Sequence, residues 1–288
     1  MTDRTALVCG AGLMGHGIAQ VLAGAGYQVR LYEPEQSRAE AGRDRIAGNL
    51  QRSVDKGRIT ADERTEQLSR LSVETDLARA ATGIEVAIEA VFEDEAVKRD
   101  LFALLDASAP AEAILASNTS SISITRLATS TRPERRPRVV GVHFFSPVPV
   151  MPLIELIRGA ETSDETEAAI RALAGDVGKQ VIVSRDRPGF IVNRILMPFL
   201  GEAMRAYDEG LGTAEDIDAG AKLGLNHPMG PLELADFIGL DVCLHIMEVL
   251  HEGFGVQHFA PPPVLRQLVD AGHLGQKSGR GFHTYPRS

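Results

Sequence analysis

A glycine-rich run, Gly10-Ala11-Gly12-Leu13-Met14-Gly15, limits the fold of this chain more than any other feature. The segment before it, Ala6-Leu7-Val8-Cys9, is apolar throughout, as in a strand that is buried on both faces. The residues after the run favour a helix. Each glycine has a steric reason, because Gly10 permits a tight turn, Gly12 lets a phosphate approach the backbone, and Gly15 lets the helix pack on the strand. The run therefore predicts a strand–turn–helix unit at the start of a parallel sheet.

Strand-like runs alternate with helix-favouring stretches over residues 1–186. The other strand candidates are rich in β-branched and apolar residues: Val29–Tyr32, Val86–Glu89, Ile114–Ala116, Val139–Val142 and Val181–Val183. This alternation predicts a Rossmann-type, doubly wound α/β sheet.

Residues 36–70 interrupt that pattern. They are highly charged, and Ile46, Leu50 and Val54 form one apolar stripe at four-residue spacing. Gly57 and Thr60 indicate a turn before a second short helix. We therefore expect a helical hairpin inserted between two strands of the sheet.

The segment Ser184–Gly189 is the best candidate for a linker, because its Pro and Gly interrupt both helices and strands. Strand signals almost disappear after it. The sequence therefore predicts that the α/β domain of residues 1–186 is followed by an all-helical C-terminal domain of residues 187–288.

Composition excludes several classes of protein. The net charge of −9 argues against a nucleic-acid-binding surface. The chain begins directly with a strand-like segment and has no apolar run of membrane-spanning length, so we expect neither a signal peptide nor a membrane helix. Only Cys9 and Cys243 are present, far apart, and the histidines show no ligand spacing. We therefore expect no disulfide, no metal, and a reducing cytoplasmic environment.

An acidic residue follows the second predicted strand, at the position that completes a dinucleotide site. Glu33 ends that strand, where a carboxylate accepts hydrogen bonds from the hydroxyls of an adenosine ribose and repels a 2′-phosphate. The next residues, Pro34–Ser37, contain no arginine that would reverse this preference. The sequence therefore predicts NAD, in preference to NADP, as the cofactor.

Four polar features beyond the glycine run suggest acid–base chemistry. Ser117–Ser121 and His143 each follow or end a predicted strand, Glu155 comes twelve residues after the histidine, and Asn193 comes just after the linker. A histidine with a carboxylate to orient it suits proton transfer at neutral pH, and hydroxyl and amide groups can bind a substrate oxygen. Taken singly, each residue also has an ordinary structural explanation as a packed histidine or a polar turn.

These features occur in the order typical of one family, and the chain resembles the 3-hydroxyacyl-CoA dehydrogenases over nearly its whole length. The bacterial enzymes that act on 3-hydroxybutyryl-CoA are the most similar in pattern. The matching segments run from the glycine run to the C-terminus and include Glu89-Ala90, Ser117–Ser121, Gly141–Pro149, Pro188–Arg194, His227–Leu234, Gly239–Asp241 and Lys277–Phe282.

The resemblance implies a role for each candidate. His143 would exchange a proton with the 3-hydroxyl while hydride moves between C3 and the nicotinamide, and Glu155 would orient the imidazole. Ser120 and Asn193 would hydrogen-bond the reacting oxygen and the thioester region. The positions near the bound NAD would be Gly10, Gly12, Leu13, Met14, Gly15, Glu33, Glu93, Lys98, Ser120, Ser146 and Lys277. Ser146 stands where the family commonly has asparagine.

The resemblance also implies that the helical domain closes on the substrate about the Pro188-Gly189 hinge and forms a homodimer. The hairpin is the candidate site for the coenzyme A tail, since residues 38–58 carry six basic side chains against three acidic ones on an acidic protein. Lys56 best matches a coenzyme A contact of the family. An ordinary solvated helix face is the alternative explanation for this charge pattern.

The sequence thus predicts an enzyme that interconverts short-chain (S)-3-hydroxyacyl-CoA and 3-oxoacyl-CoA with NAD, without nucleic-acid or membrane partners. The sequence leaves the pathway open between fatty-acid breakdown, aromatic-acid breakdown and acyl-CoA synthesis. Two alternatives stay open. One is the same chemistry on carrier-protein-bound or free hydroxy acids, and the other is a catalytically silent NAD-binding protein.

Overall fold

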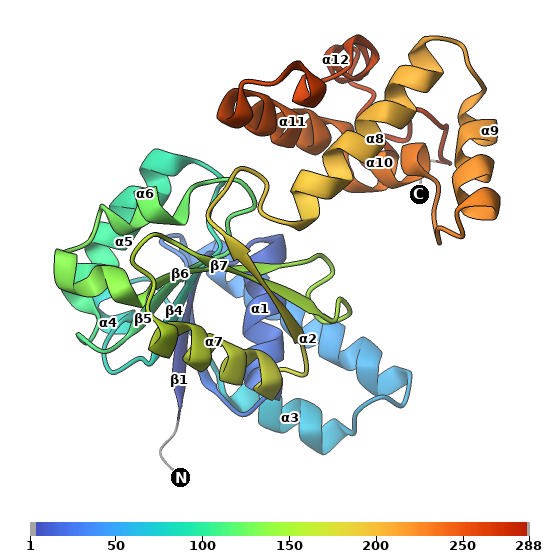
Figure 1. Cartoon of the computed structure of the whole chain (residues 1–288). Helices are drawn as coiled ribbons and strands as arrows, with labels where there is room; N and C mark the ends of the chain where they lie inside the picture. The colour runs from blue at the N-terminus through green and yellow to red at the C-terminus, as the bar shows by residue number, and fades with distance from the viewer. Residues whose placement is uncertain (1–3, 287–288) are drawn as a thin grey trace. The chain divides into compact units, whose positions relative to one another are not determined.

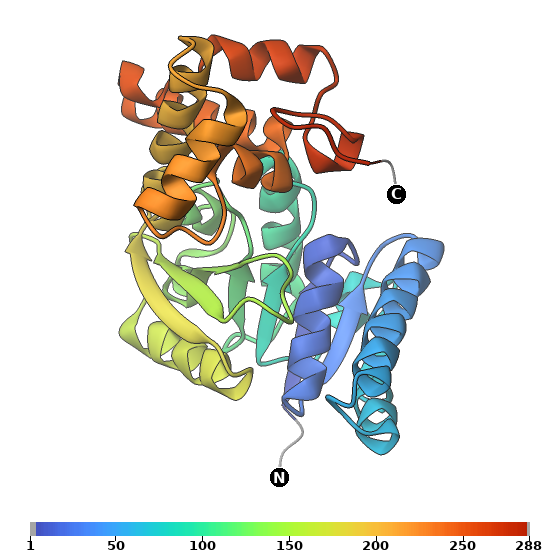
Figure 2. The same cartoon turned by 90° about the vertical axis from the view of Figure 1, so that its right-hand side faces the viewer.

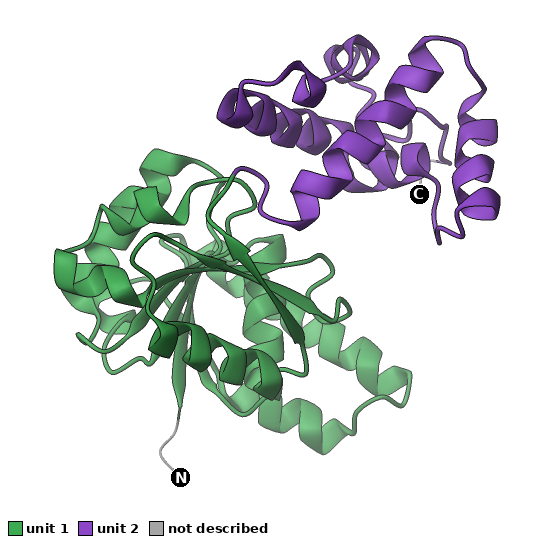
Figure 3. Ribbon diagram, in the orientation of Figure 1, with its two compact units in different colours: residues 1–187 green, residues 188–288 purple. Residues whose placement is uncertain are grey.

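The computed structural model describes residues 4–286, which form two compact units, one ending at Arg187 and the other beginning at Pro188 (Figure 3). Residues 1–3 and 287–288 of the two predicted domains lie outside this range. The first unit contains one eight-stranded sheet with helices on both faces, and the second unit is helical (Figure 1). The predicted fold class, an α/β sheet followed by helices, is confirmed.

The sheet has the strand order β3-β2-β1-β4-β5-β6-β7-β8. The strands are β1 Thr5–Cys9, β2 Gln28–Tyr32, β3 Leu71–Glu74, β4 Val86–Glu89, β5 Ile114–Ser117, β6 Val139–Phe144, β7 Leu153–Arg158 and β8 Gln180–Arg185. The first six in chain order are parallel, whereas β7 is antiparallel to β6 and parallel to β8. Strand order reverses between β1 and β4, and ligands of such sheets bind in the crevice at that point.

Two strands escaped the sequence-based prediction, and both lack the usual signal. β3 is four residues long and only its first residue is buried. β7 follows a loop rich in proline, and the charged Glu155 lies in its middle. A charged residue in the middle of an apolar run does not predict a strand, and neither does a short run that is mostly not buried. Both segments can be recognised as strands only from their pairing in the sheet.

The helices of the first unit cover the sheet and carry the insertion. They are α1 Leu13–Gly24, α2 Gln36–Asp55, α3 Ala61–Ser69, α4 Leu77–Ala80, α5 Glu95–Ser108, α6 Ile124–Ala128 and α7 Asp164–Asp176, with the 3-10 turn η1 Pro133–Arg138. The helical hairpin consists of α2 and α3 and lies beside α1 (Figure 2). Ile46 and Leu50 of α2 are buried in the main core, so the first helix of the hairpin packs against the α/β unit.

The second unit is built around its own apolar core. Its helices are α8 Val192–Asp208, α9 Ala214–Ala219, α10 Pro231–Ile238, α11 Leu240–Phe254 and α12 Pro263–Asp270, with the short segments η2 Gly220–Gly224, η3 Gln257–Phe259 and η4 Gln276–Ser278. Gly239, at φ +105°, separates α10 from α11. Within residues 4–286, none of the helices combines the length and apolar character that crossing a membrane requires.

Two buried aspartates hold the C-terminal segment against α10. Asp218 accepts hydrogen bonds from the backbone N–H groups of Leu232 and Glu233 at the start of α10, at 2.8 and 3.0 Å. It also contacts the His283 ring at 2.7 Å. Asp236 accepts bonds from the backbone of His283 and from the Tyr285 hydroxyl. Buried carboxylates satisfied in this way tie the end of the chain to the helical core.

Candidate active site

The glycine run adopts the geometry that the sequence predicted for a phosphate-binding turn. Gly10 has φ +103°, and a Cβ there would lie 2.5 Å from the carbonyl oxygen of Ala90. A Cβ on Gly15 would lie 1.8 Å from the Gly10 carbonyl oxygen, so the helix and the turn can approach only without side chains. Gly12, in contrast, has open space where its Cβ would be, and it begins α1 without a side-chain cap. The first N–H groups of α1 therefore face a space that suits a diphosphate.

Glu33 lies beside this turn, at the carboxyl end of β2. Its Oε2 accepts a hydrogen bond from the backbone N–H of Ala11 at 3.2 Å. Its side chain is only 12% exposed, so this carboxylate is held against the glycine run. Arg38, in the first turn of α2, places its Nε 3.9 Å from Glu33 Oε1. Arg38 lies one residue beyond the segment Pro34–Ser37, in which no arginine was found, so the sequence did not predict its contact with Glu33.

His143 and Glu155 form a hydrogen-bonded pair. They lie opposite each other in the antiparallel pairing of β6 and β7, which brings their side chains to the same face of the sheet. His143 Nδ1 is 3.1 Å from Glu155 Oε2, and both side chains are buried. Because a carboxylate only accepts, the contact assigns the proton to Nδ1 and leaves Nε2 as the basic nitrogen of the neutral ring.

The serine-rich loop 117–121 is anchored to both neighbouring strands. Asn118 Oδ1 accepts a hydrogen bond at 2.9 Å from the backbone N–H of Phe144, next to His143. Glu93 Oε1 accepts bonds from the Ser120 backbone N–H and hydroxyl, at 2.8 and 3.2 Å, and from the hydroxyl of Thr119 at 2.6 Å. The structure thus brings the predicted residues Ser120 and Glu93 together and ties their loop to the strand that carries His143.

A buried charge cluster lies behind this loop. The Lys98 ammonium is 2.6 Å from Glu89 Oε1 and 3.0 Å from Glu93 Oε2, and its side chain is 1% exposed. Burial favours the neutral acid, and it raises the pKa of Glu89 despite the bonds from Lys98 and Ser117. Burial acts in the same direction on Glu93, but Lys98 and the loop hydroxyls outweigh it and lower the pKa of Glu93 to about 2. Glu93 therefore keeps its charge at neutral pH.

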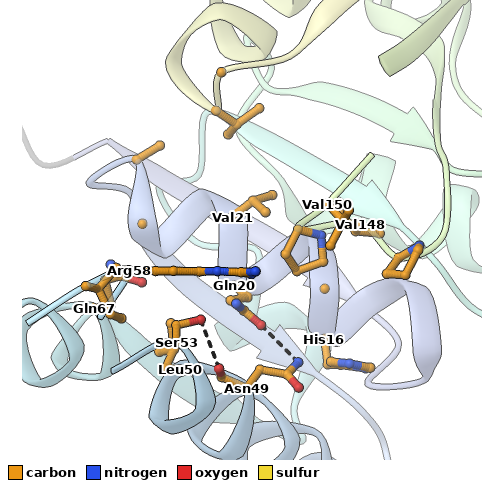
Figure 4. A pocket seen from close by; sticks show the side chains of 18 of the residues that line it. His16, Gln20, Val21, Asn49, Leu50, Ser53, Arg58, Gln67, Val148 and Val150 are labelled. Carbon is orange, nitrogen blue, oxygen red and sulfur yellow. Dashed lines mark hydrogen bonds between the residues drawn. The ribbon is translucent and has the colours of Figure 1, made fainter. Parts of the chain in front are cut away.

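A cavity of about 770 Å³ lies between α1, the hairpin and the loop after β6 (Figure 4). Its basic lining residues are Arg52, Lys56 and Arg58, and the Arg58 side chain extends across the pocket. Apolar side chains, including Val21 and Val148, form other parts of the wall. Two predicted site residues thus line the same cavity: Ser146 lies in the loop after β6, and Lys56 lies at the end of α2.

The loop between β6 and β7 is held by a buried lysine. Lys179 Nζ donates hydrogen bonds to the carbonyl oxygens of Val148 and Met151, both at 2.6 Å. Burial lowers the pKa of Lys179. This lysine fixes the cavity wall that contains Ser146.

Asn193 and Lys277 belong to the second unit. Asn193 lies in the first turn of α8 and is buried. Lys277, in η4, contacts both carboxylate oxygens of Asp241, at 2.5 and 2.6 Å, and its side chain is 47% exposed. Their roles toward NAD and the thioester stay predictions.

Three residues of this region received no role from the sequence, namely Glu89, His16 and Lys179, and Arg38 was counted only among the basic residues of the hairpin. His16 lines the cavity, and its Nδ1 is 2.7 Å from the Gly12 carbonyl oxygen. Glu89 carried a usable signal, since an acid that ends a fully apolar strand is expensive to bury without a partner. The other three look like ordinary surface residues until tertiary packing brings them to the site.

Comparison with known proteins agrees with this geometry. Residues 5–187 match the model of the "3-hydroxyacyl-CoA dehydrogenase, NAD binding domain" and residues 189–285 match the "3-hydroxyacyl-CoA dehydrogenase, C-terminal domain". The chain belongs to the 3-hydroxyacyl-CoA dehydrogenase family. Its first unit is the NAD-binding domain of that family, which confirms the predicted cofactor.

Individual relatives match over nearly the full chain. A probable 3-hydroxybutyryl-CoA dehydrogenase of Bacillus subtilis is 48% identical over 99% of this chain and 98% of its own length. A 3-hydroxybutyryl-CoA dehydrogenase of Bradyrhizobium diazoefficiens is 51% identical over 96% of this chain and 94% of its own length. The crystal structure of an (S)-3-hydroxybutyryl-CoA dehydrogenase from Ralstonia eutropha superposes with a TM-score of 0.95 at 43% identity, covering 99% of this chain and all of that one.

The depressed pKa of Glu93 predicts a pH-dependent contribution to stability. The folded-state pKa is below the value near 4.3 of an unfolded chain, so this stabilisation is complete above about pH 4.5 and is lost as pH falls toward 2. Glu93→Gln should lower the free energy of unfolding by about 2 kcal/mol at pH 7, because Lys98 and the loop lose a charged acceptor. Urea unfolding at pH 7, 5 and 4 should show a constant difference from wild type at the first two values and a smaller one at pH 4. Glu112→Gln, on the exposed surface of the same unit, is the control, and an unchanged difference at pH 4 would contradict this assignment.

Proposed function

We propose that this protein catalyses the NAD-dependent oxidation of short-chain (S)-3-hydroxyacyl-CoA, with 3-hydroxybutyryl-CoA as the preferred substrate, and the reverse reduction. The His143–Glu155 pair, held on two strands next to the serine loop, is the observation that carries this proposal. The pair supplies a proton acceptor at the carboxyl edge of the sheet. The glycine run lies at the same edge, at the end of β1, where it suits a dinucleotide. The full-length similarity to 3-hydroxybutyryl-CoA dehydrogenases supports the choice of substrate.

The residues of the glycine run and Glu33 fit the cofactor. Gly12 leaves room at the start of α1 for the diphosphate, and Glu33 is positioned by Ala11 to accept hydrogen bonds from the adenosine ribose. Leu13 and Met14 follow in the first turn of α1. We assign the nicotinamide end to the loop side, near Ser146, Ser120 and the Glu93–Lys98 pair. NAD bound in this way would accept hydride from C3 of the hydroxyacyl group.

His143 performs the proton transfer in this mechanism. Nε2 takes the proton from the 3-hydroxyl as the C3–H bond breaks, so that the alcohol becomes a ketone, and it returns the proton in the reduction. Glu155, bonded to Nδ1, holds the ring orientation and stabilises the imidazolium that forms. The Ser120 hydroxyl, held in its loop by Glu93 and Asn118, would exchange its 3.2 Å bond to Glu93 Oε1 for one that it donates to the substrate oxygen.

The cavity between α1 and the hairpin is our proposed site for coenzyme A. Its apolar wall suits the pantetheine chain, and Arg52, Lys56 and Arg58 suit the nucleotide phosphates. The cavity explains why basic residues gather on this hairpin in a protein of net charge −9. The placement of three of them around one cavity supports this site over a merely solvated helix face.

The second unit contributes closure and dimerisation to the proposal. Two consecutive residues with positive φ, Gly189 and Phe190, form the start of this unit, and Asn193 follows in α8. Movement about this joint would bring Asn193 to the thioester and exclude water.

The buried cysteines, whose thiol pKa values are raised by burial, are consistent with a cytoplasmic location.

Replacement of the catalytic pair tests the reaction. His143→Ala should reduce kcat/KM for acetoacetyl-CoA with NADH by about a thousandfold, because proton transfer is lost. Glu155→Gln keeps the shape but not the charge and should lower kcat by about tenfold or more, with little change in KM. The assay follows NADH absorbance, and NADH binding to each variant confirms that the first unit is folded.

The same assay separates the rival functions. Turnover of the acetoacetyl group on coenzyme A should exceed turnover on an acyl carrier protein or of free acetoacetate. Faster reaction on the carrier protein would identify a different carrier. Wild-type protein that binds NADH and turns over none of the three would be a silent NAD-binding protein.

Truncation of Lys56 tests the coenzyme A site. Lys56→Ala should raise KM for acetoacetyl-CoA by about fivefold and leave kcat unchanged, because a phosphate contact far from the reacting carbon is lost. Acetoacetyl-pantetheine, which lacks the nucleotide, should be unaffected and serves as the matched substrate. Arg43→Ala, an exposed change on α2 outside the cavity lining, should also have no effect. An unchanged KM for the coenzyme A thioester in Lys56→Ala would remove this residue from the site.

Dimerisation is tested by sedimentation equilibrium. The second unit exposes large apolar side chains: Ile195, Leu211, Leu223, Leu225, Phe237, Val242 and Val256. Burial of such residues between copies would stabilise a dimer, so we expect twice the chain mass at micromolar concentration. A single chain mass under the same conditions would contradict the homodimer.

A further inference from the structure

Arg38 stands where the adenosine ribose would meet the protein, and nothing in the reaction described above uses it. Glu33 Oε2 is fixed by the Ala11 N–H, so its other oxygen, Oε1, points toward Arg38 Nε at 3.9 Å. The Glu33 side chain is 12% exposed and the Arg38 side chain 59%. The carboxylate is therefore held in place while the guanidinium, on the outer side, has room to move.

The charges of this pair act in opposite directions on a 2′-phosphate. Glu33 binds ribose hydroxyls and repels a dianionic phosphate, which favours NAD. A guanidinium in hydrogen-bonding reach of the same position attracts that phosphate and can contact two of its oxygens. As long as Glu33 is present, Arg38 has a carboxylate to pair with and the preference for NAD stands.

We propose that Arg38 is a second specificity-determining residue of the dinucleotide site: the Glu33 carboxylate excludes NADP in the wild type, and Arg38 decides how well NADP binds once that carboxylate is removed. Arg38 is the latent ligand of a 2′-phosphate, and loss of Glu33 makes it available. This inference rests on the NAD site of the proposed function, but not on the identity of the thioester substrate.

A double-mutant cycle measures this role through binding. Dissociation constants of NADH and NADPH would be determined by calorimetry for wild type, Glu33→Ser, Arg38→Ala and the double variant. We expect Glu33→Ser to shift the NADPH-to-NADH affinity ratio toward NADPH by about a hundredfold or more, since repulsion is removed and ribose bonds are lost. Adding Arg38→Ala should weaken NADPH by about tenfold and leave NADH within about twofold.

Smaller probes locate the effect at the ribose. Adenosine 2′,5′-bisphosphate should follow the NADPH result in all four proteins, whereas 5′-AMP should follow NADH. Arg43→Ala in the Glu33→Ser background removes an equal charge from the same helix. It should leave unchanged both the NADPH-to-NADH affinity ratio and the corresponding ratio for the two smaller probes. Glu33→Gln, which keeps an acceptor for the Ala11 N–H, repeats the cycle in a protein with less structural change.

The inference is overturned if the double variant binds NADPH as tightly as Glu33→Ser, or if Arg43→Ala has the same effect as Arg38→Ala. Failure of the proposed reaction is a separate result, since it would appear as normal NADH binding by wild type without turnover of acetoacetyl-CoA. The binding cycle is read in the absence of any thioester, so its outcome stands in either case.

Discussion

The antiparallel pairing of β7 with β6 is the constraint on which the candidate active site depends. All other neighbouring strands in this sheet are parallel, and parallel pairing at this edge would send the next strand away from the site. Because β7 runs back along β6, Glu155 faces His143 across the ladder, and the connecting loop returns over the cavity. Lys179 lies between the end of α7 and the start of β8, and it holds that loop by hydrogen bonds to two carbonyl oxygens. One reversal of strand direction thus sets both the His143–Glu155 pair and the cavity wall.

The neighbouring strand ends are organised by buried charge. Two carboxylates, Glu89 and Glu93, share the single ammonium of Lys98. Burial disfavours the ionised form of Glu89. Glu93 stays ionised and accepts hydrogen bonds from the hydroxyl and N–H groups of the serine loop. Such a cluster stabilises only when every member is satisfied. Its geometry therefore connects β4, α5 and the loop of Ser120, and it gives that loop one conformation beside His143.

Local chemistry made most of the fold predictable. The glycine run, the apolar strands and the charged stretch of the hairpin each carry their own signal, because turn sterics, strand burial and helix periodicity act within a few residues. The candidates His143, Glu155, Ser120 and Asn193 were nameable from the order of matching segments in a known family. β3 and β7 were missed, since a short strand and a strand with a central glutamate are stable only through their neighbours.

By itself, the sequence determined the fold class and the cofactor NAD, and it named His143 as the candidate acid–base residue. Tertiary structure decided the rest: that Glu155 faces His143, that Lys98 serves two carboxylates, and that Arg38 reaches the side chain of Glu33. These contacts join residues on different strands and helices, and they depend on register, helix position and burial. No periodicity or spacing along a chain encodes those three quantities directly, because each results from packing between elements that are formed separately.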